Sequence, residues 1–169
     1  MTLNASPQSV AAGTEDARQD DLGLLGNDPV FMLIRAGAVG RARGNEVLAD
    51  LGLRTRDYSV LSTAASGLVT QKQLAEFLML NPSQVVALVD GLEKRGLVKR
   101  SPSPHDRRAK IVTATAKGQK VFAEARDRLL RTHDVMFAPL TAEERAVVLR
   151  VLPFLAFPPD CPDTAHRRA

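Results

Sequence analysis

Two helix start signals follow one another closely in the middle of this chain, and this tandem constrains the fold more than any other feature. At residues 70–73 a threonine is followed three positions later by a glutamine, which is the order found in a capping box. Residues 81–84 repeat the device, with Asn81 in the capping position and Pro82 at the first helical position. Because so little chain separates the two short helices, they must meet at a sharp turn. The segment therefore predicts a helix-turn-helix.

The pattern changes once the second of these helices ends. Its apolar residues recur at the spacing i, i+3, i+4 and i+7 of one helix face: Val85, Leu88, Val89 and Leu92. Gly96 marks the end of the helix. Residues 97–100 and 109–114 then predict two short strands, and residues 101–108, with prolines and charged side chains, predict the loop between them. A hairpin in this place is the wing of a winged helix-turn-helix.

Longer helices are predicted on both sides of this winged lobe, which occupies residues 55–114. Before it, residues 28–54 predict a helix and a loop, with Pro29 at the first helical position. After it, residues 115–157 predict a long helix and a final helix. Threonines are predicted to cap three of the helices: Thr55, Thr115 and Thr141. The flanking helices are too apolar on one side to stand alone, so we expect them to be dimerisation helices that a second subunit covers.

The two ends of the chain lack a sustained apolar pattern. Residues 1–27 are rich in small and polar residues and predict a mostly disordered tail, with a short helix near residues 21–25. Residues 158–169 are rich in proline and predict a flexible tail. The expected fold class is therefore mainly α, a winged helix-turn-helix with a small β-hairpin wing and a helical dimerisation region.

Positive charge is concentrated in one short window of the chain. Residues 94–110 hold seven Lys and Arg residues against Asp106 alone, a net charge of +6, whereas residues 1–27 carry a net charge of −3. Such a window is the electrostatic footprint of a protein that binds a polyanion. No apolar run approaches the roughly 20 residues that cross a bilayer, and residues 1–10 lack the pattern of a signal peptide. We expect a cytoplasmic protein with no membrane partner.

Short motifs occur in a fixed order along the middle of the chain. They are Gln73-Leu74-Ala75, Asn81-Pro82-Ser83, Leu88-Val89-Asp90-Gly91-Leu92-Glu93-Lys94-Arg95-Gly96-Leu97-Val98, Asp106-Arg107-Arg108-Ala109-Lys110 and Thr115-Ala116-Lys117-Gly118. Each is weak alone, but their order and spacing together are specific. With these motifs and its order of helices, the chain resembles the MarR family of bacterial transcription regulators over residues 29–155.

The resemblance implies a homodimer joined by the first, fifth and sixth helices of the family fold, with two winged lobes on a pseudo-palindromic operator in double-stranded DNA. Half-sites would then lie one helical turn apart, roughly 34–36 Å. The family also implies a regulator, more often a repressor than an activator, that a small aromatic or phenolic acid releases. Tyr58, Arg35 and Arg41 are considered as residues lining such a ligand site, although a plain surface position is the safer expectation for the two arginines.

Seven residues of the two short helices are predicted to contact DNA: Thr70, Gln71, Lys72, Ser83, Gln84, Val86 and Ala87. The first three open a helix whose backbone N–H groups and dipole suit a phosphate, although capping alone explains Thr70 equally well. The other four lie opposite the apolar stripe of the second helix. Ser83 and Gln84 can form hydrogen bonds with base edges, whereas the two apolar side chains offer only apolar contact, for instance to a thymine methyl group. Many relatives carry a longer polar or basic side chain in place of Ala87, so groove shape and wing contacts are expected to carry more of the specificity.

The tip of the predicted wing is assigned through the resemblance. The family pattern implies that Asp106 orients Arg108, and that this arginine enters the minor groove, where the negative potential is greatest. Arg107 and His105 are expected to lie near phosphates or to make no contact. The alternative is a solvated surface turn in which charges simply cluster.

No catalytic residue, metal site or cofactor is predicted. Glu143 and Glu144 are paired carboxylates, but they stand in the first turn of a helix, where they stabilise the dipole. No phosphate-binding glycine loop, nucleophile elbow or zinc spacing occurs, and Cys161 is expected to be an inert thiol. The predicted function is a sequence-specific transcription regulator and not an enzyme. The alternatives left open are a winged-helix protein-interaction module without specific DNA binding and a small-molecule binding protein or enzyme built in the interhelical cleft.

Overall fold

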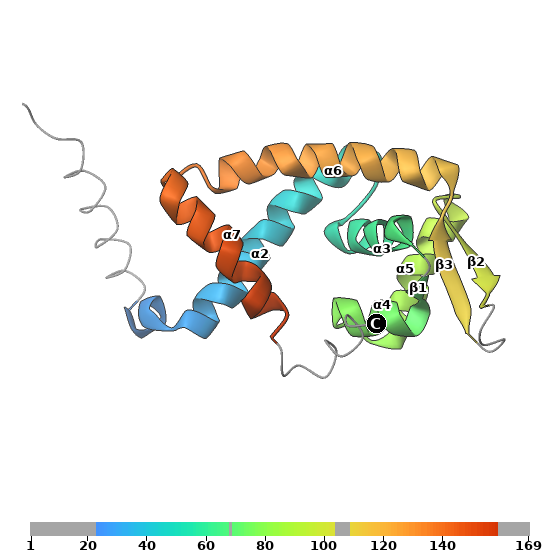
Figure 1. The fold of residues 1–169 in the computed structure, drawn as a ribbon, viewed down its shortest axis with the longest axis horizontal. Helices are drawn as coiled ribbons and strands as arrows, with labels where there is room; N and C mark the ends of the chain where they lie inside the picture. The colour runs from blue at the N-terminus through green and yellow to red at the C-terminus, as the bar shows by residue number, and fades with distance from the viewer. Residues whose placement is uncertain (1–22, 68, 104–108, 159–169) are drawn as a thin grey trace, which may run out of the picture. The chain divides into compact units, whose positions relative to one another are not determined.

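The computed structural model describes residues 23–67, 69–103 and 109–158, apart from the side chain of His133. Helices dominate these residues, and one small antiparallel sheet accompanies them, which confirms the predicted fold class (Figure 1). The elements are η1 (Gly23–Asn27), α2 (Pro29–Leu48), η2 (Ala49–Leu51), α3 (Thr55–Ser66), β1 (Val69–Thr70), α4 (Gln71–Leu78), α5 (Pro82–Lys94), β2 (Val98–Pro102), β3 (Lys110–Ala114), α6 (Ala116–Met136) and α7 (Ala142–Ala156). The chain divides within α2 into two compact units, Met1–Ala42 and Arg43–Ala169.

The first unit holds η1 and most of α2. The Asp28 carboxylate accepts hydrogen bonds from the backbone N–H groups of Val30 (2.9 Å) and Phe31 (3.1 Å), so α2 begins at Pro29 as predicted. The short helix expected near residues 21–25 is a 3-10 helix slightly further along, at Gly23–Asn27, so this part of the predicted disordered tail has regular structure. The apolar stripe of α2 is exposed at Val30, Leu33, Ile34 and Val39.

In the second unit, β2 and β3 form the predicted hairpin, with a register that runs from Val98↔Ala114 to Pro102↔Lys110. A further strand, β1, was not predicted; it pairs antiparallel with β3 and makes the order β1-β3-β2. A strand of two residues is too short to show the alternation that identifies strands in a sequence. Because β1 ends at Thr70, the sheet fixes the position at which α4 begins.

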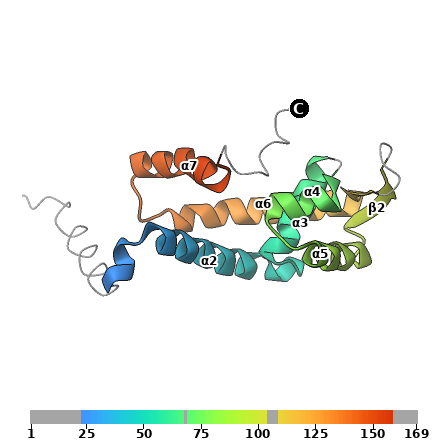
Figure 2. The same cartoon turned by 90° about the horizontal axis from the view of Figure 1, so that it is seen from below.

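The core of the winged lobe includes side chains from the neighbouring helices as well. One face of α5 is buried against α3, α4 and the sheet, and Leu48 from the end of α2 and Ala125 from α6 are fully buried in the same cluster. The helix α3 lies along the first part of α6 in both views (Figures 1 and 2). There the rings of Tyr58 and Phe122 stack with centroids 5.9 Å apart. The first half of α6 therefore packs as part of the lobe.

Most of the predicted helix caps are present. Thr70 Oγ1 accepts a hydrogen bond from the Gln73 N–H, and Gln73 Oε1 accepts one from the Thr70 N–H. Thr115 Oγ1 accepts from the N–H of Gly118 (3.0 Å), at the start of α6. At the start of α7, Thr141 and Glu144 form the same reciprocal pair. Hydrogen bonds from the backbone and then the side chain of Thr141 lower the pKa of Glu144.

The cap predicted for α3 is wrong. Thr55 is the first residue of α3, and the N-cap is Arg54, whose N–H donates to the Asp57 carboxylate at 2.8 Å. The N–H and the hydroxyl of Thr55 both donate to Asn45 Oδ1, at 2.8 and 3.0 Å. Because Asp57 already satisfies the N-cap, the Thr55 side chain instead ties the start of α3 to the end of α2.

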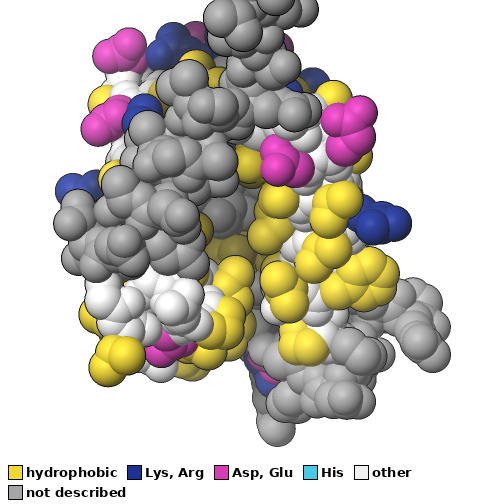
Figure 3. All heavy atoms as spheres, turned by 90° about the vertical axis from the view of Figure 1, so that its left-hand side faces the viewer, with side chains coloured by type: hydrophobic (Ala, Val, Ile, Leu, Met, Phe, Trp, Pro, Cys, Tyr) yellow, Lys and Arg dark blue, Asp and Glu magenta, His cyan; other side chains and the backbone are white. Residues whose placement is uncertain are grey.

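Apolar side chains cover much of the surface of α7 (Figure 3). The exposed large apolar residues on this helix are Val147, Leu149, Val151, Leu152, Phe154 and Leu155. Exposed apolar surface of this extent is unusual on a soluble monomer and marks an interaction surface. Among the described residues, no helix is both long enough and apolar enough to span a bilayer.

Candidate nucleic-acid interface

The outward face of α5 is the first part of the candidate interface. Val85, Val89 and Leu92 turn inward and are buried, which leaves the opposite face of the helix free. All four residues predicted on this helix are exposed: Ser83, Gln84, Val86 and Ala87. One of them is already engaged, because Gln84 Oε1 accepts a hydrogen bond from the backbone N–H of Asn81 at 3.1 Å. The face near the start of α5 therefore combines two polar and two aliphatic side chains, and one of the polar groups is already bonded.

The turn before α5 sets the angle at which this face is presented. Met79 ends α4 in the left-handed region, with φ of 51°, and its side chain is 80% exposed. The N–H of Leu80 donates to the carbonyl of Ala75 at 2.9 Å, which closes the end of α4. A residue with a Cβ atom is strained in this conformation, so the sharp turn predicted from the spacing of the two caps is made at an energetic cost.

The start of α4 is the second part. Its first-turn backbone N–H groups lie at the helix N-terminus, where a phosphate is favoured. The Lys72 side chain is 86% exposed, and its Nζ atom lies 3.7 Å from Glu76 Oε1. Thr70 is occupied by capping, as the alternative explanation for this residue expected. The amide nitrogen of Gln71 is buried and lacks a hydrogen-bond partner among the described residues. The Gln71 side-chain nitrogen is therefore not available at the surface.

The wing is the third part, and its base is well defined. The N–H of Ser103 donates to the carbonyl of Ala109 at 2.9 Å, next to the last β2–β3 pair. The predicted tip residues Asp106, Arg107 and Arg108 lie outside the described residues. The hairpin nevertheless fixes where the two ends of that loop leave the sheet.

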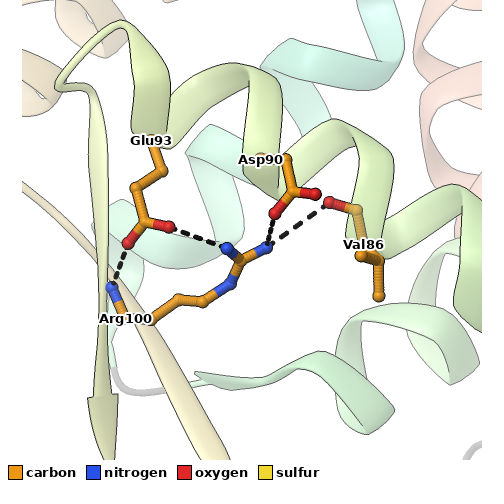
Figure 4. A network of polar contacts seen from close by, with 4 residues as sticks. All are labelled: Val86, Asp90, Glu93 and Arg100. Carbon is orange, nitrogen blue, oxygen red and sulfur yellow. Dashed lines mark hydrogen bonds and ion pairs between the residues drawn. The ribbon is translucent and has the colours of Figure 1, made fainter.

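An ion-pair network that the sequence analysis missed joins β2 to α5 (Figure 4). The Arg100 guanidinium donates to Glu93 Oε2 at 2.7 Å and to Asp90 Oδ1 at 2.5 Å, and its backbone N–H donates to Glu93 Oε1 at 2.9 Å. A weaker bond of 3.4 Å reaches the carbonyl of Val86. The Arg100 side chain is only 16% exposed. The network holds the wing strand at a fixed place on the helix.

This arrangement corrects the charge argument made from the sequence. Arg100 was counted in the +6 window, but the structure neutralises it between two carboxylates. The guanidinium of Arg95 is also occupied, because it donates to the carbonyls of Leu51 and Gly52, both at 2.7 Å. The sequence does contain a signal for the pairing of Arg100, since Asp90 and Glu93 are spaced i, i+3 and therefore lie on one side of the helix that precedes β2.

The start of α6 forms hydrogen bonds with the corner between α5 and β2. The Thr115 hydroxyl donates to the carbonyl of Gly96 at 2.7 Å, and Lys117 Nζ donates to the carbonyl of Arg95 at 2.9 Å. Gly118 lies so close to this corner that a Cβ atom there would stand 1.9 Å from the carbonyl oxygen of Leu97. Glycine is therefore required at this position, which explains its place in the sequence motif.

The residues considered for a ligand site lie in different units, Arg35 and Arg41 in the first and Tyr58 in the second. Tyr58 lies on α3 against Phe122, and the Arg126 guanidinium stands 5.9 Å from the Phe122 ring centroid. Burial raises the pKa of Tyr58, while Arg126 and a hydrogen bond with Ser62 act in the opposite direction. Arg35 and Arg41 are exposed on α2, as the safer expectation had it. Among the described residues, no group of His, Cys, Asp and Glu could hold a metal ion, and Cys161 lies outside them.

Comparisons with known proteins agree with this geometry. Residues 51–109 match the model of the MarR family. The chain is 33% identical over 101 residues to YdcH of Bacillus subtilis, an uncharacterized HTH-type transcriptional regulator, which covers 56% of this chain and 69% of that protein. It is 34% identical to CouR from Rhodococcus jostii RHA1 bound to p-coumaroyl-CoA, with a TM-score of 0.71 over 81% of this chain and 97% of that chain. The transcriptional repressor CouR bound to a 23-mer DNA duplex is 29% identical, with a TM-score of 0.73 over 80% of this chain and 96% of that chain.

Proposed function

This chain belongs to the MarR family of transcriptional regulators, and from that membership we propose that it represses transcription as a homodimer bound to a pseudo-palindromic operator. The observation that carries the proposal is the free outward face of α5, beside the start of α4 and the strands that lead into the wing. Proteins with a helix-turn-helix place the second helix in the major groove, with residues near its N-terminus on the base edges. The similarity to CouR, a repressor solved with a DNA duplex, supports the same use here.

Three groups of residues divide the work in this proposal. Those on α5 contact base edges and those at the start of α4 bind a phosphate. At the wing tip Arg108, oriented by Asp106, enters the minor groove, and Arg107 lies near phosphates or makes no contact. In that order they are Ser83, Gln84, Val86 and Ala87; Thr70, Gln71 and Lys72; and Asp106, Arg107 and Arg108. The links from Arg100 and from the first turn of α6 act as positioning contacts, because they keep helix and hairpin in one rigid lobe.

The homodimer is proposed from the uncovered apolar helices. Both α2 and α7 leave apolar side chains in water, and a second copy of the chain offers the same surfaces in return. A dimer also places two recognition helices at the spacing of successive turns of DNA. Sedimentation equilibrium at micromolar concentration tests this point, and a purely monomeric protein would refute it.

A small aromatic or phenolic ligand is proposed as the signal that releases DNA. The support is the similarity to CouR, which was solved with p-coumaroyl-CoA. Such a ligand lowers the affinity for DNA only if it binds the DNA-free conformation more tightly than the DNA-bound one. Titration of aromatic acids and their CoA thioesters into the DNA complex tests the idea, and no release by any of them would count against it.

The DNA proposal is tested by capturing genomic fragments on the purified protein and searching the enriched fragments for an inverted repeat. On that repeat, Arg108→Ala should weaken binding by about 1–3 kcal/mol, and affinity should fall steeply as salt rises. Arg131→Ala is the matched control, because it removes the same charge from an exposed position late in α6. Equal affinity for the repeat and for scrambled DNA at physiological salt would overturn the proposal and favour a protein-interaction module.

A further inference from the structure

We infer that the protein recognises the 5-methyl group of thymine through Val86, so that each operator half-site contains a thymine whose methyl group adds to the affinity. The inference rests on the proposed binding to an operator and adds the chemistry by which the sequence is distinguished. It follows from what the exposed face of α5 offers to a base and from which of its polar groups are already bonded.

The exposed face of α5 forms one stripe along the helix. Ser83, Val86, Ala87 and Asp90 stand at i, i+3, i+4 and i+7 and therefore share one side. Val86 is 44% exposed although it is a large apolar residue, and Ala87 beside it is exposed as well. The centre of the stripe is thus apolar, and no described residue covers it.

Two of the polar side chains around this apolar centre, Asp90 and Gln84, already form a hydrogen bond within the lobe. Asp90 is held by the Arg100 guanidinium, which also reaches the Val86 carbonyl and closes the far end of the stripe (Figure 4). The Gln84 side chain uses one lone pair of its oxygen to accept from the Asn81 N–H, which holds its amide group at the start of α5. The Ser83 hydroxyl and the Gln84 amide group lie at the start of the helix, and Val86 and Ala87 are the apolar contacts that the stripe offers to a base.

An apolar surface can still distinguish base pairs in the major groove. Each base pair displays donors and acceptors there, and among the four bases only thymine adds an apolar group, the 5-methyl. Because a helix-turn-helix presents the residues near the start of its second helix to the base edges, Val86 is placed to contact that methyl group. Burial of one methyl group corresponds to about a fourfold change in affinity, and two half-sites in a dimer would give about fifteenfold.

The test is to replace each thymine of the captured operator, one position at a time, by deoxyuridine, which differs only by the missing methyl group. We expect one thymine per half-site whose replacement weakens binding about fourfold. With Val86→Ala, the same replacement should change affinity less than twofold, because the contacting methyl groups of the side chain are gone. Ser83→Ala is the control on the same stripe and should keep the full deoxyuridine effect.

A complementary duplex tests the methyl group apart from the rest of the base. A C·G pair at the sensitive position should bind more weakly than the same pair carrying 5-methylcytosine, since the added methyl occupies the place of the thymine methyl. If no deoxyuridine replacement weakens binding to an operator that is clearly preferred over scrambled DNA, the inference is wrong while the proposed function stands. An effect of the same size in Val86→Ala would also overturn it. A protein that does not prefer the operator at all refutes the proposed function instead.

Discussion

Replacing Arg100 by methionine should destabilise the winged lobe more than any other loss of a single basic residue from the window 94–110 within the described part of the chain. The substitution keeps an unbranched side chain of similar length and removes the guanidinium. It leaves Asp90 and Glu93 without the cation that both of them contact, at 2.5 and 2.7 Å. The backbone bond from the Arg100 N–H to Glu93 remains.

The expected loss follows from the geometry and exposure of the network. Hydrogen bonds to charged groups contribute about 1.5–3 kcal/mol each, and breaking a fully buried ion pair costs about 3–5 kcal/mol. The carboxylates here are 46% and 38% exposed, so water recovers part of the loss. We expect a decrease of about 2 kcal/mol in the free energy of unfolding, which for a chain of this size is a decrease of about 4–8 °C in Tm.

Lys99→Met is the matched control for this variant, because Lys99 neighbours Arg100 on β2, carries the same charge and is exposed. Urea unfolding of both variants should show a loss for Arg100→Met and a change within about 0.5 kcal/mol for Lys99→Met. A double-mutant cycle with Glu93→Gln should give a coupling energy of about 1 kcal/mol. Equal stabilities of the two variants, or a coupling energy near zero, would refute the view that the network holds β2 on α5.

Three further expectations concern single positions. Gly118→Ala should lower the free energy of unfolding in urea by about 3 kcal/mol, because the added Cβ atom meets the Leu97 carbonyl. Gly91→Ala, in open space on α5, should raise it by about 0.5–1 kcal/mol. Similar effects of the two substitutions would contradict the close approach at Gly118. Met79→Gly should raise the free energy of unfolding by up to about 1 kcal/mol in the same assay, because it relieves the left-handed backbone of an exposed residue; Met79→Ala keeps the Cβ atom and should give no such gain. The tyrosinate absorbance reports Tyr58 alone, since the chain has one tyrosine and no tryptophan, and it should titrate above pH 10.0 in the folded protein and near that value in urea. Burial raises this pKa, so the associated stability is complete below pH 10.0 and is lost as pH rises through the folded value; equal midpoints in both states would contradict it.

Local signals were enough to predict the helices and the hairpin. The caps at Thr70, Thr115 and Thr141 mark starts that the structure reproduces, because a cap is formed by residues three apart in the chain. The two strands of the wing were located to within two residues at each end. The strand β1 escaped detection because its identity depends on pairing with β3, far away in the sequence.

The partners of individual side chains could not be predicted from the sequence either, because they too depend on contacts between different elements. A count of charges gives Arg95 and Arg100 the same weight as Lys99, yet the structure places the first two guanidinium groups against carbonyl and carboxylate oxygens. The same limitation applies to Thr55, whose expected capping position is taken by Arg54 because Asp57 accepts its N–H. The exposure of the candidate residues on α5 could be predicted, since the apolar stripe of a helix also identifies its opposite face.

The hydrogen bonds between the start of α6 and the corner after α5 have a consequence for how these two helices can move. Three carbonyl groups at that corner, those of Arg95, Gly96 and Leu97, are held by the first turn of the long helix. Packed elements joined in this way shift together rather than deform. A displacement of the beginning of α6 therefore moves α5 as well. A change in the position of α5 relative to the end of α6 therefore has to arise beyond this corner, in the later turns of α6.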